Sequence, residues 1–214
     1  MEREAAVERV MSIVDAIESE PMPVPIREVW VFGDLALGLD PVDRVDVYLA
    51  KDMLYTVDTE TPDIPESIAT IAGVGETVSA TWAATHPELV RTNDAGYAAP
   101  ERCLAATLVG RDEPIHLEIC NAGFEDNVTQ RVRGAANRDA YEEILDPRGV
   151  CLWMKGVRSE EAPTRLREGT YVFPTLPEAL EMIGMEADAA TVAAKTVTAW
   201  RAQQHGATVR GDVL

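Results

Sequence analysis

The spacing of apolar residues along the chain predicts one long helix and four strands. Apolar side chains recur at helical intervals over residues 2–19, which predicts an amphipathic helix. Short apolar runs predict buried strands at 28–32 and 44–50, and a shorter strand is predicted at 150–154. Apolar and polar residues alternate strictly over 115–120. That segment is therefore expected to be a strand with two chemically different faces.

The rest of the chain has weaker helical patterns, separated by glycine, proline and polar stretches. Thr175 and Glu178 have the spacing of a capping box, in which each side chain satisfies an amide at the start of a short helix. The other predicted segments are helices at 64–72, 76–84, 100–109 and 189–200, a helical region at 124–145 broken near Gly134, a loop at 56–63, a connector at 155–165 and a frayed tail. Strands interspersed with helices predict an α/β or α+β fold, with a small mixed sheet flanked by helices.

The pattern also predicts how the chain is divided. A soft boundary near residues 154–162 separates an α/β domain at 1–156 from a helical C-terminal extension at 157–214, packed on that domain. With 214 residues, of which 46% are hydrophobic, the chain can bury a sizeable core.

Charge is the strongest compositional feature. The chain has 37 acidic and 19 basic residues, a formal net charge of -18, and its only lysines are Lys51, Lys155 and Lys195. Abundant acid with scarce lysine is typical of intracellular proteins from salt-accumulating halophilic archaea, because a strongly hydrated acidic surface stays soluble where salt screens self-repulsion. The alternative is an ordinary acidic protein with solvated faces.

The sequence predicts a cytoplasmic protein without membrane contact. No apolar run approaches the roughly 18 residues that a membrane-spanning helix needs, and five of the first ten residues are charged. The cysteines are three in number and widely spaced, which fits reduced thiols better than a disulfide framework.

The stretch VWVFGDLALGLDPVDRVDVYLA, residues 29–50, contains the candidate chemistry. A strand runs into Gly33, a turn with Gly38 follows, and the next strand carries Asp46. A glycine after a strand lets the backbone approach phosphate oxygens, and carboxylates on neighbouring strands can hold the metal ions of phosphoryl transfer. Glu118, on the polar face of the later strand, is the candidate for a further acid. This arrangement resembles the minimal nucleotidyltransferase superfamily, which implies Asp46 and Glu118 as catalytic candidates.

Three positions depart from the pattern of that superfamily. Asp34 replaces a serine, Leu37 replaces the arginine of the turn, and Arg44 replaces the first metal-binding acid. A cation about 4 Å from a divalent ion costs several kcal/mol at an effective dielectric constant near 20. The sequence therefore predicts that the metal site is lost, and that Arg44 occupies the place of the metal and bridges Asp46 and Glu118.

This reading implies a non-catalytic, nucleotidyltransferase-like protein that binds a nucleotide, RNA or protein partner and needs no cofactor. One alternative is an active, magnesium-dependent nucleotidyltransferase that uses Asp46 and Glu118 with an out-of-register Asp43 or Asp34. Another is a polar strand edge without any relation to that superfamily.

Two other segments could bind phosphate. Gly73-Val74-Gly75 resembles the turn of a helix-hairpin-helix motif, which implies a DNA-contacting module; the alternative is a glycine turn between packed helices. Arg131 and Arg138 share a helix face if the helix continues through Gly134, and they could take a phosphate-bearing ligand or make exposed ion pairs. The predicted phosphate or ligand-binding residues are Gly33, Asp34, Gly38, Arg44, Arg131 and Arg138.

A further likeness covers most of the chain. The stretches VWVFGDLALGLDP, PIHLEICNAGFEDNVTQR, LDPRGVCLW and VFPTLPEALEMIG resemble an uncharacterised family of small acidic proteins from halophilic archaea. That resemblance implies no activity.

Overall fold

The computed structural model describes residues 1–214 except 55–62, 139, 204–205 and 212–214. In the described residues, six strands form one mixed sheet in the order β5-β4-β1-β2-β3-β6. β1 is antiparallel to β2 and β4, whereas β2, β3 and β6 run parallel to one another. The strands are β1 (Ile26–Phe32), β2 (Val45–Lys51), β3 (Ile115–Cys120), β4 (Gly149–Met154), β5 (Val157–Arg158) and β6 (Thr208–Gly211).

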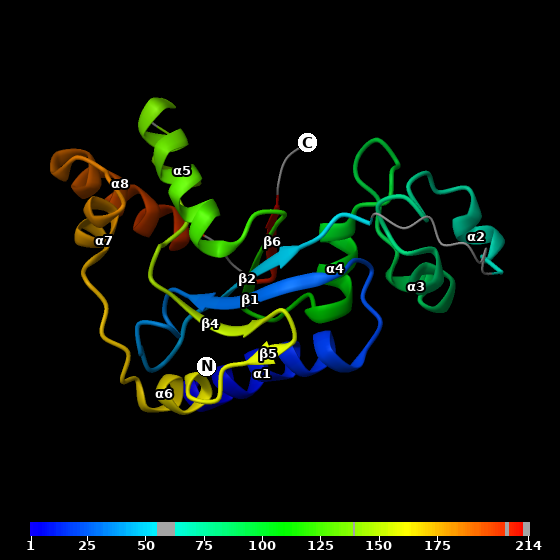
Figure 1. Cartoon of the computed structure of the whole chain (residues 1–214), viewed down its shortest axis with the longest axis horizontal. Helices are drawn as coiled ribbons and strands as arrows, with labels where there is room; N and C mark the ends of the chain where they lie inside the picture. The colour runs from blue at the N-terminus through cyan, green and yellow to red at the C-terminus, as the bar shows by residue number, and fades with distance from the viewer. Residues whose placement is uncertain (55–62, 139, 204–205, 212–214) are drawn as a thin grey trace.

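Helices cover both faces of this sheet. Figure 1 shows α1 and α6 on one side of it and α5, α7 and α8 on the other. The helices of eight or more residues are α1 (Arg3–Ser19), α4 (Pro100–Leu108), α5 (Phe124–Arg138) and α8 (Ala187–Arg201). The shorter ones are α2 (Glu66–Ala69), α3 (Ala80–Thr85), α6 (Ala162–Glu168), α7 (Leu176–Met182) and the single 3-10 turns Pro87–Leu89 and Tyr141–Glu143.

Alternation along the central strands creates two different cores. On β2, Val45, Val47 and Leu49 face the core formed with α1, α4 and α6. Tyr48 and Ala50 face α5, where Phe124 stacks on the ring of Trp30. The polar side chains of β2 and β3 therefore lie on the α5 and α8 side of the sheet.

The small helices α2 and α3 belong to a lobe at one end of the sheet, on the right in Figure 1. This lobe has its own apolar cluster around the buried Trp82. The lobe can extend away from the sheet because it buries apolar residues in a cluster of its own.

The predicted mixed α/β architecture is confirmed, and so is the capping box, since Thr175 and Glu178 satisfy each other's backbone amides. The strand predicted at 115–120 is β3, with the same bounds. The helices predicted at 64–72 and 76–84 are the much shorter α2 and α3. The loop predicted at 56–63 lies mostly outside the described residues.

Three local predictions were wrong. α5 continues through Gly134, because Val132 and Ala135 on either side are buried against α7 and α8. The predicted connector contains β5 and the first residues of α6, and the predicted frayed tail contains β6.

The division into domains at 1–156 and 157–214 stays a prediction. The second segment holds α6, α7 and α8, and it also contributes β5 and β6 to the sheet. Among the residues that the structure describes, no helix is both long and apolar enough to cross a bilayer.

Candidate functional site

Asp46 lies at the centre of a buried group of charges. Its backbone on β2 pairs with Phe32 on β1 and His116 on β3, and its side chain is fully buried. One carboxylate oxygen lies 2.7 Å from Arg44 Nη2, and the other lies 2.6 Å from Arg201 Nη2. Each oxygen of Asp46 is thus in an ion pair with a guanidinium group of the same chain.

Glu118 has its own set of cationic partners on β3. His116 Nε2 lies 3.0 Å from Glu118 Oε1, and Arg210 Nε donates to the same oxygen at 2.5 Å. Arg131 Nη2 lies 3.1 Å from Oε2. The ion pairs of Glu118 therefore involve Arg131 and Arg210, while Arg44 pairs with Asp46. The predicted bridge from Arg44 to both acids was wrong.

His116 connects the two acids. It lies opposite Asp46 in the strand register, and its Nδ1 is 2.6 Å from the hydroxyl oxygen of Thr208 on β6. Trp200 packs edge-on against the imidazole and also receives the guanidinium of Arg210 over its ring, 4.8 Å from the centroid. Side chains from β2, β3, β6 and α8 thus form one contiguous cluster.

Burial and the neighbouring positive charges shift the pKa of each of the two acids in opposite directions. Burial raises the pKa of Asp46, and Arg201 and Arg44 oppose that rise. Burial also acts to raise the pKa of Glu118, but the hydrogen bond from His116 and the charges of Arg210 and Arg131 outweigh it, so its pKa lies below the ordinary value. Glu118 is therefore an acid that the fold stabilises in its ionised form.

Gly33 ends β1 against this cluster. Its backbone has a φ of +68°, and a Cβ added there would overlap Arg201 Nη2 and Asp46 Oδ2. The glycine after the strand therefore accommodates an arginine from α8, whose Nη2 also lies 3.2 Å from Asp34 Oδ1.

Gly33→Ala is expected to lower the free energy of unfolding by about 1–3 kcal/mol, because it adds left-handed backbone strain and displaces Arg201 from Asp46. Urea unfolding would measure the loss. Gly96→Ala is the matched control, since Gly96 also has positive φ but a Cβ there meets nothing within 4 Å. An equal loss in both variants would contradict the role of the arginine contact.

The structure brings some of the predicted site residues together and places others apart. Gly33, Asp34 and Arg44 surround Asp46, and Arg131 contacts Glu118. Three other residues lie elsewhere: the half-buried Gly38 packs on Gly169, Arg138 pairs with Glu143 at the surface, and Asp43 faces solvent. A phosphate or ligand site formed by these residues stays a prediction.

The turn at 73–75 uses its polar groups internally. Gly75 donates its amide to Val78, and the carbonyl of Gly73 accepts from three following amides. α3 begins only at Ala80, capped by Ser79. The following helix therefore does not start at the glycine turn.

Sequence reasoning missed Arg201, Arg210 and His116 as members of the cluster. His116 shares the strand face of Glu118, so its proximity could have been inferred from the alternation. Arg201 and Arg210 belong to no motif, and they reach the acids only because α8 and β6 return to the sheet.

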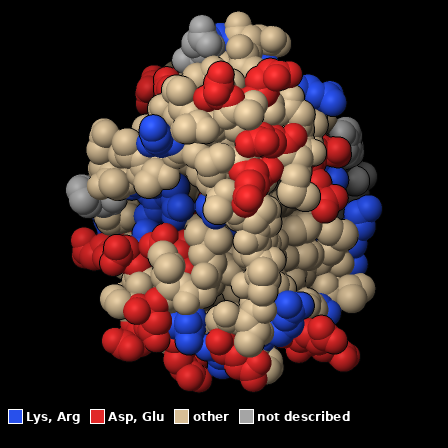
Figure 2. Space-filling model, turned by 90° about the vertical axis from the view of Figure 1, so that its left-hand side faces the viewer, with Lys and Arg blue, Asp and Glu red and all other residues tan. Residues whose placement is uncertain are grey.

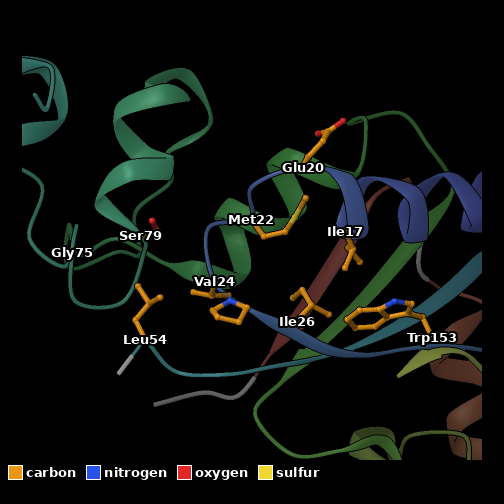
Figure 3. A pocket seen from close by; sticks show the side chains of 10 residues that line it. Ile17, Glu20, Met22, Val24, Ile26, Leu54, Gly75, Ser79 and Trp153 are labelled. Atoms are coloured by element: carbon orange, nitrogen blue, oxygen red, sulfur yellow. The ribbon is translucent and has the colours of Figure 1, made fainter. Parts of the chain in front are cut away.

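Three hollows in the described part of the molecule bear on where a ligand could bind. The one beside the charged cluster is lined by Arg44, Arg201 and Arg210, among others, and encloses about 10 Å³, roughly the space of one water molecule. The hollow in Figure 3 encloses about 420 Å³ between Trp153 on β4 and Ser79 of the small lobe, and Glu20 is the only charged residue among its described lining residues. The third, about 500 Å³, lies between α4 and β6.

The surface reflects the excess of acid. In Figure 2, acidic side chains gather near the top and along the lower edge of the face, with a group of basic side chains at the left of centre. Within the described residues, no group of three or more histidine, cysteine, aspartate or glutamate side chains has the arrangement of a metal site.

The fold and the cluster define a mixed α/β protein in which arginines of the same chain neutralise buried acids. The chain belongs to the family of unknown function DUF7095, whose model matches residues 2–214. No curated protein and no solved structure matches it. The prediction of a family without an assigned activity is thereby confirmed, whereas the halophilic source and the relation to nucleotidyltransferases stay predictions.

Proposed function

We propose that this chain is a non-catalytic binding or regulatory protein built on a nucleotidyltransferase-like core that no longer uses divalent metal. The observation that carries the proposal is the pairing of both Asp46 oxygens with Arg44 and Arg201, at 2.7 and 2.6 Å. Those oxygens would have to coordinate a metal in an active enzyme of this kind.

Placing Mg²⁺ at Asp46 would require displacement of two guanidinium groups that are themselves largely buried. The Arg44 side chain is 9% exposed and that of Arg201 is 18% exposed. Removing a buried cation from its closest carboxylate costs several kcal/mol, and Mg²⁺ also demands near-octahedral oxygen ligands. The ion-pair cluster is therefore favoured over a metal centre.

The nucleotidyltransferase-like part of the proposal is supported by the placement of three residues. Gly33 follows β1, and Asp46 on β2 and Glu118 on β3 project from the same face of the sheet. This is the order and geometry that the sequence resemblance implies. The partner proposed for such a core is a nucleotide, an RNA or a protein.

A comparison of the wild type with Asp46→Asn tests the loss of metal chemistry. Both proteins are expected to bind Mn²⁺ equally and weakly, because any binding comes from the acidic surface and not from Asp46. Electron paramagnetic resonance of free Mn²⁺ during a titration would measure this. If the wild type bound one Mn²⁺ ion per chain tightly and Asp46→Asn did not, the proposal would be refuted.

Incubation with labelled nucleoside triphosphates and Mg²⁺ in molar KCl addresses the active-enzyme alternative directly. No sustained nucleotidyl transfer is expected. Transfer that persists in the wild type and disappears in Asp46→Asn would establish the chain as an enzyme instead.

A further inference from the structure

Three arginines surround the hollow on the α4 side of the sheet, and none of its described lining residues is acidic. The hollow encloses about 500 Å³ and is bounded by α4, the loop after α4, β3 and β6. Its charged residues are Arg91, Arg102 and Arg111. In a chain with 37 acidic and 19 basic residues, this lining has the opposite sign to the whole molecule.

The three guanidinium groups differ in how strongly they are engaged. Arg91 is fixed by donating to the carbonyl oxygens of Glu88 and Val90. Arg102 donates to the carbonyl oxygen of Thr92 at 2.8 Å and pairs with Asp94 at 3.1 Å, but the Asp94 side chain is 95% exposed, so solvent screens that ion pair. Arg111 is exposed and forms no side-chain ion pair or hydrogen bond with any described residue. Arg111 can therefore turn to an incoming anion, and Arg102 can offer it the Nη2 group that now pairs with the exposed Asp94.

The wall of the hollow beside these cations is apolar. It is formed by Ala105, Ala106, Val109, Leu117, Ala207 and Val209. A volume of this size falls within the range of small-molecule sites, roughly 300–1,000 Å³, in which apolar walls hold the body of a ligand and a few polar groups fix its orientation.

We propose that this hollow, the arginine pocket, binds a phosphomonoester with an apolar or aromatic body. Three arginines, one of them partly balanced by Asp94, leave about two positive charges, and a phosphomonoester carries about -1.5 to -2 near neutral pH. A single carboxylate would balance only one of them. The planar guanidinium fork also matches the oxygen geometry of phosphate.

The arginine pocket goes beyond the proposed function and does not depend on it. Leu117 and Val209 are paired in the β3–β6 register and face the pocket, whereas Glu118 and Arg210, the next pair, face the charged cluster. Because the two sites lie on opposite faces of the sheet, phosphomonoester binding and metal binding are separate measurements, and either proposal can fail alone.

Isothermal titration with adenosine 5′-monophosphate, hexyl phosphate, adenosine and inorganic phosphate tests the inference. At least one of the two phosphomonoesters is expected to bind ten or more times more tightly than both adenosine and inorganic phosphate. Comparing the affinities of the two phosphomonoesters shows whether the pocket prefers a nucleoside or an alkyl body. Arg102→Gln and Arg111→Gln are each expected to weaken that binding about tenfold or more, since each removes a charged hydrogen-bond donor.

Two further variants make the test specific. Ala106→Phe fills the pocket without changing charge and is expected to abolish binding. Arg133→Gln removes one exposed charge from α5, away from the pocket lining, and is expected to leave binding unchanged. The inference is overturned if neither phosphomonoester binds, if the Arg102→Gln/Arg111→Gln double variant binds like the wild type, or if Arg133→Gln weakens binding equally.

Discussion

Asp46→Ala is expected to lower the free energy of unfolding by about 3–5 kcal/mol, the usual cost of removing one partner from a buried ion pair. The carboxylate is fully buried, and its loss leaves Arg44 and Arg201 without their closest counter-charge. Arg44 Nη1 and Arg201 Nε already lack a hydrogen-bond partner among the described residues. Urea unfolding at constant KCl concentration would measure the change.

Asp34→Ala is the matched control for this prediction. Asp34 pairs with the same Arg201, at 3.2 Å, but its side chain is 19% exposed and Arg201 keeps its closer pair with Asp46. Its loss is expected to cost about 1 kcal/mol or less. If both variants lost the same stability, Asp46 would not be the centre of the cluster.

Glu118→Gln is expected to cost a similar 3–5 kcal/mol and also to change how stability depends on pH. The folded state holds the pKa of Glu118 below its ordinary value of 4.5, so the native protein binds this proton more weakly than the unfolded chain. The stabilisation from Glu118 is therefore complete above about pH 4.5 and is lost as the pH falls through the folded pKa. Glutamine lacks this contribution at every pH.

The difference in unfolding free energy between wild type and Glu118→Gln is thus expected to shrink as the solution is acidified below about pH 4.5. Glu113→Gln provides the comparison, because the hydrogen bond from Arg9 also lowers the pKa of Glu113 but that side chain is 36% exposed. Its stability change is expected to stay below about 1 kcal/mol. If the difference in unfolding free energy between wild type and Glu118→Gln did not change with pH, Glu118 would not be ionised in the folded protein.

The segments predicted correctly are those in which local pattern and tertiary packing agree. The alternation at 115–120 fits a strand between two different cores, and the capping box fixes the start of α7 through its own side chains. Gly134 misled the prediction because its helix cost of about 1 kcal/mol is outweighed by the burial of Val132 and Ala135. β6 has only four residues and exists through its pairing with β3, which no local pattern reveals.

The candidate site divides in the same way. Arg44 directly precedes β2 and lies two residues before Asp46, so the alternation of the strand predicted at 44–50 places both side chains on the same side of the sheet. Arg201 and Arg210 could not be found by spacing, because Arg201 meets Asp46 across 155 residues and Arg210 meets Glu118 across 92. An ion pair between residues far apart in the chain produces no periodic pattern in the sequence.

These separations have a consequence for synthesis on the ribosome. The strands that carry Asp46 and Glu118 emerge well before Arg201 and Arg210, so a nascent chain that has already collapsed around β1, β2 and β3 would bury two carboxylates lacking those counter-ions. The full set of charges on the α8 side of the sheet is therefore expected to assemble only after residue 210 has left the exit tunnel.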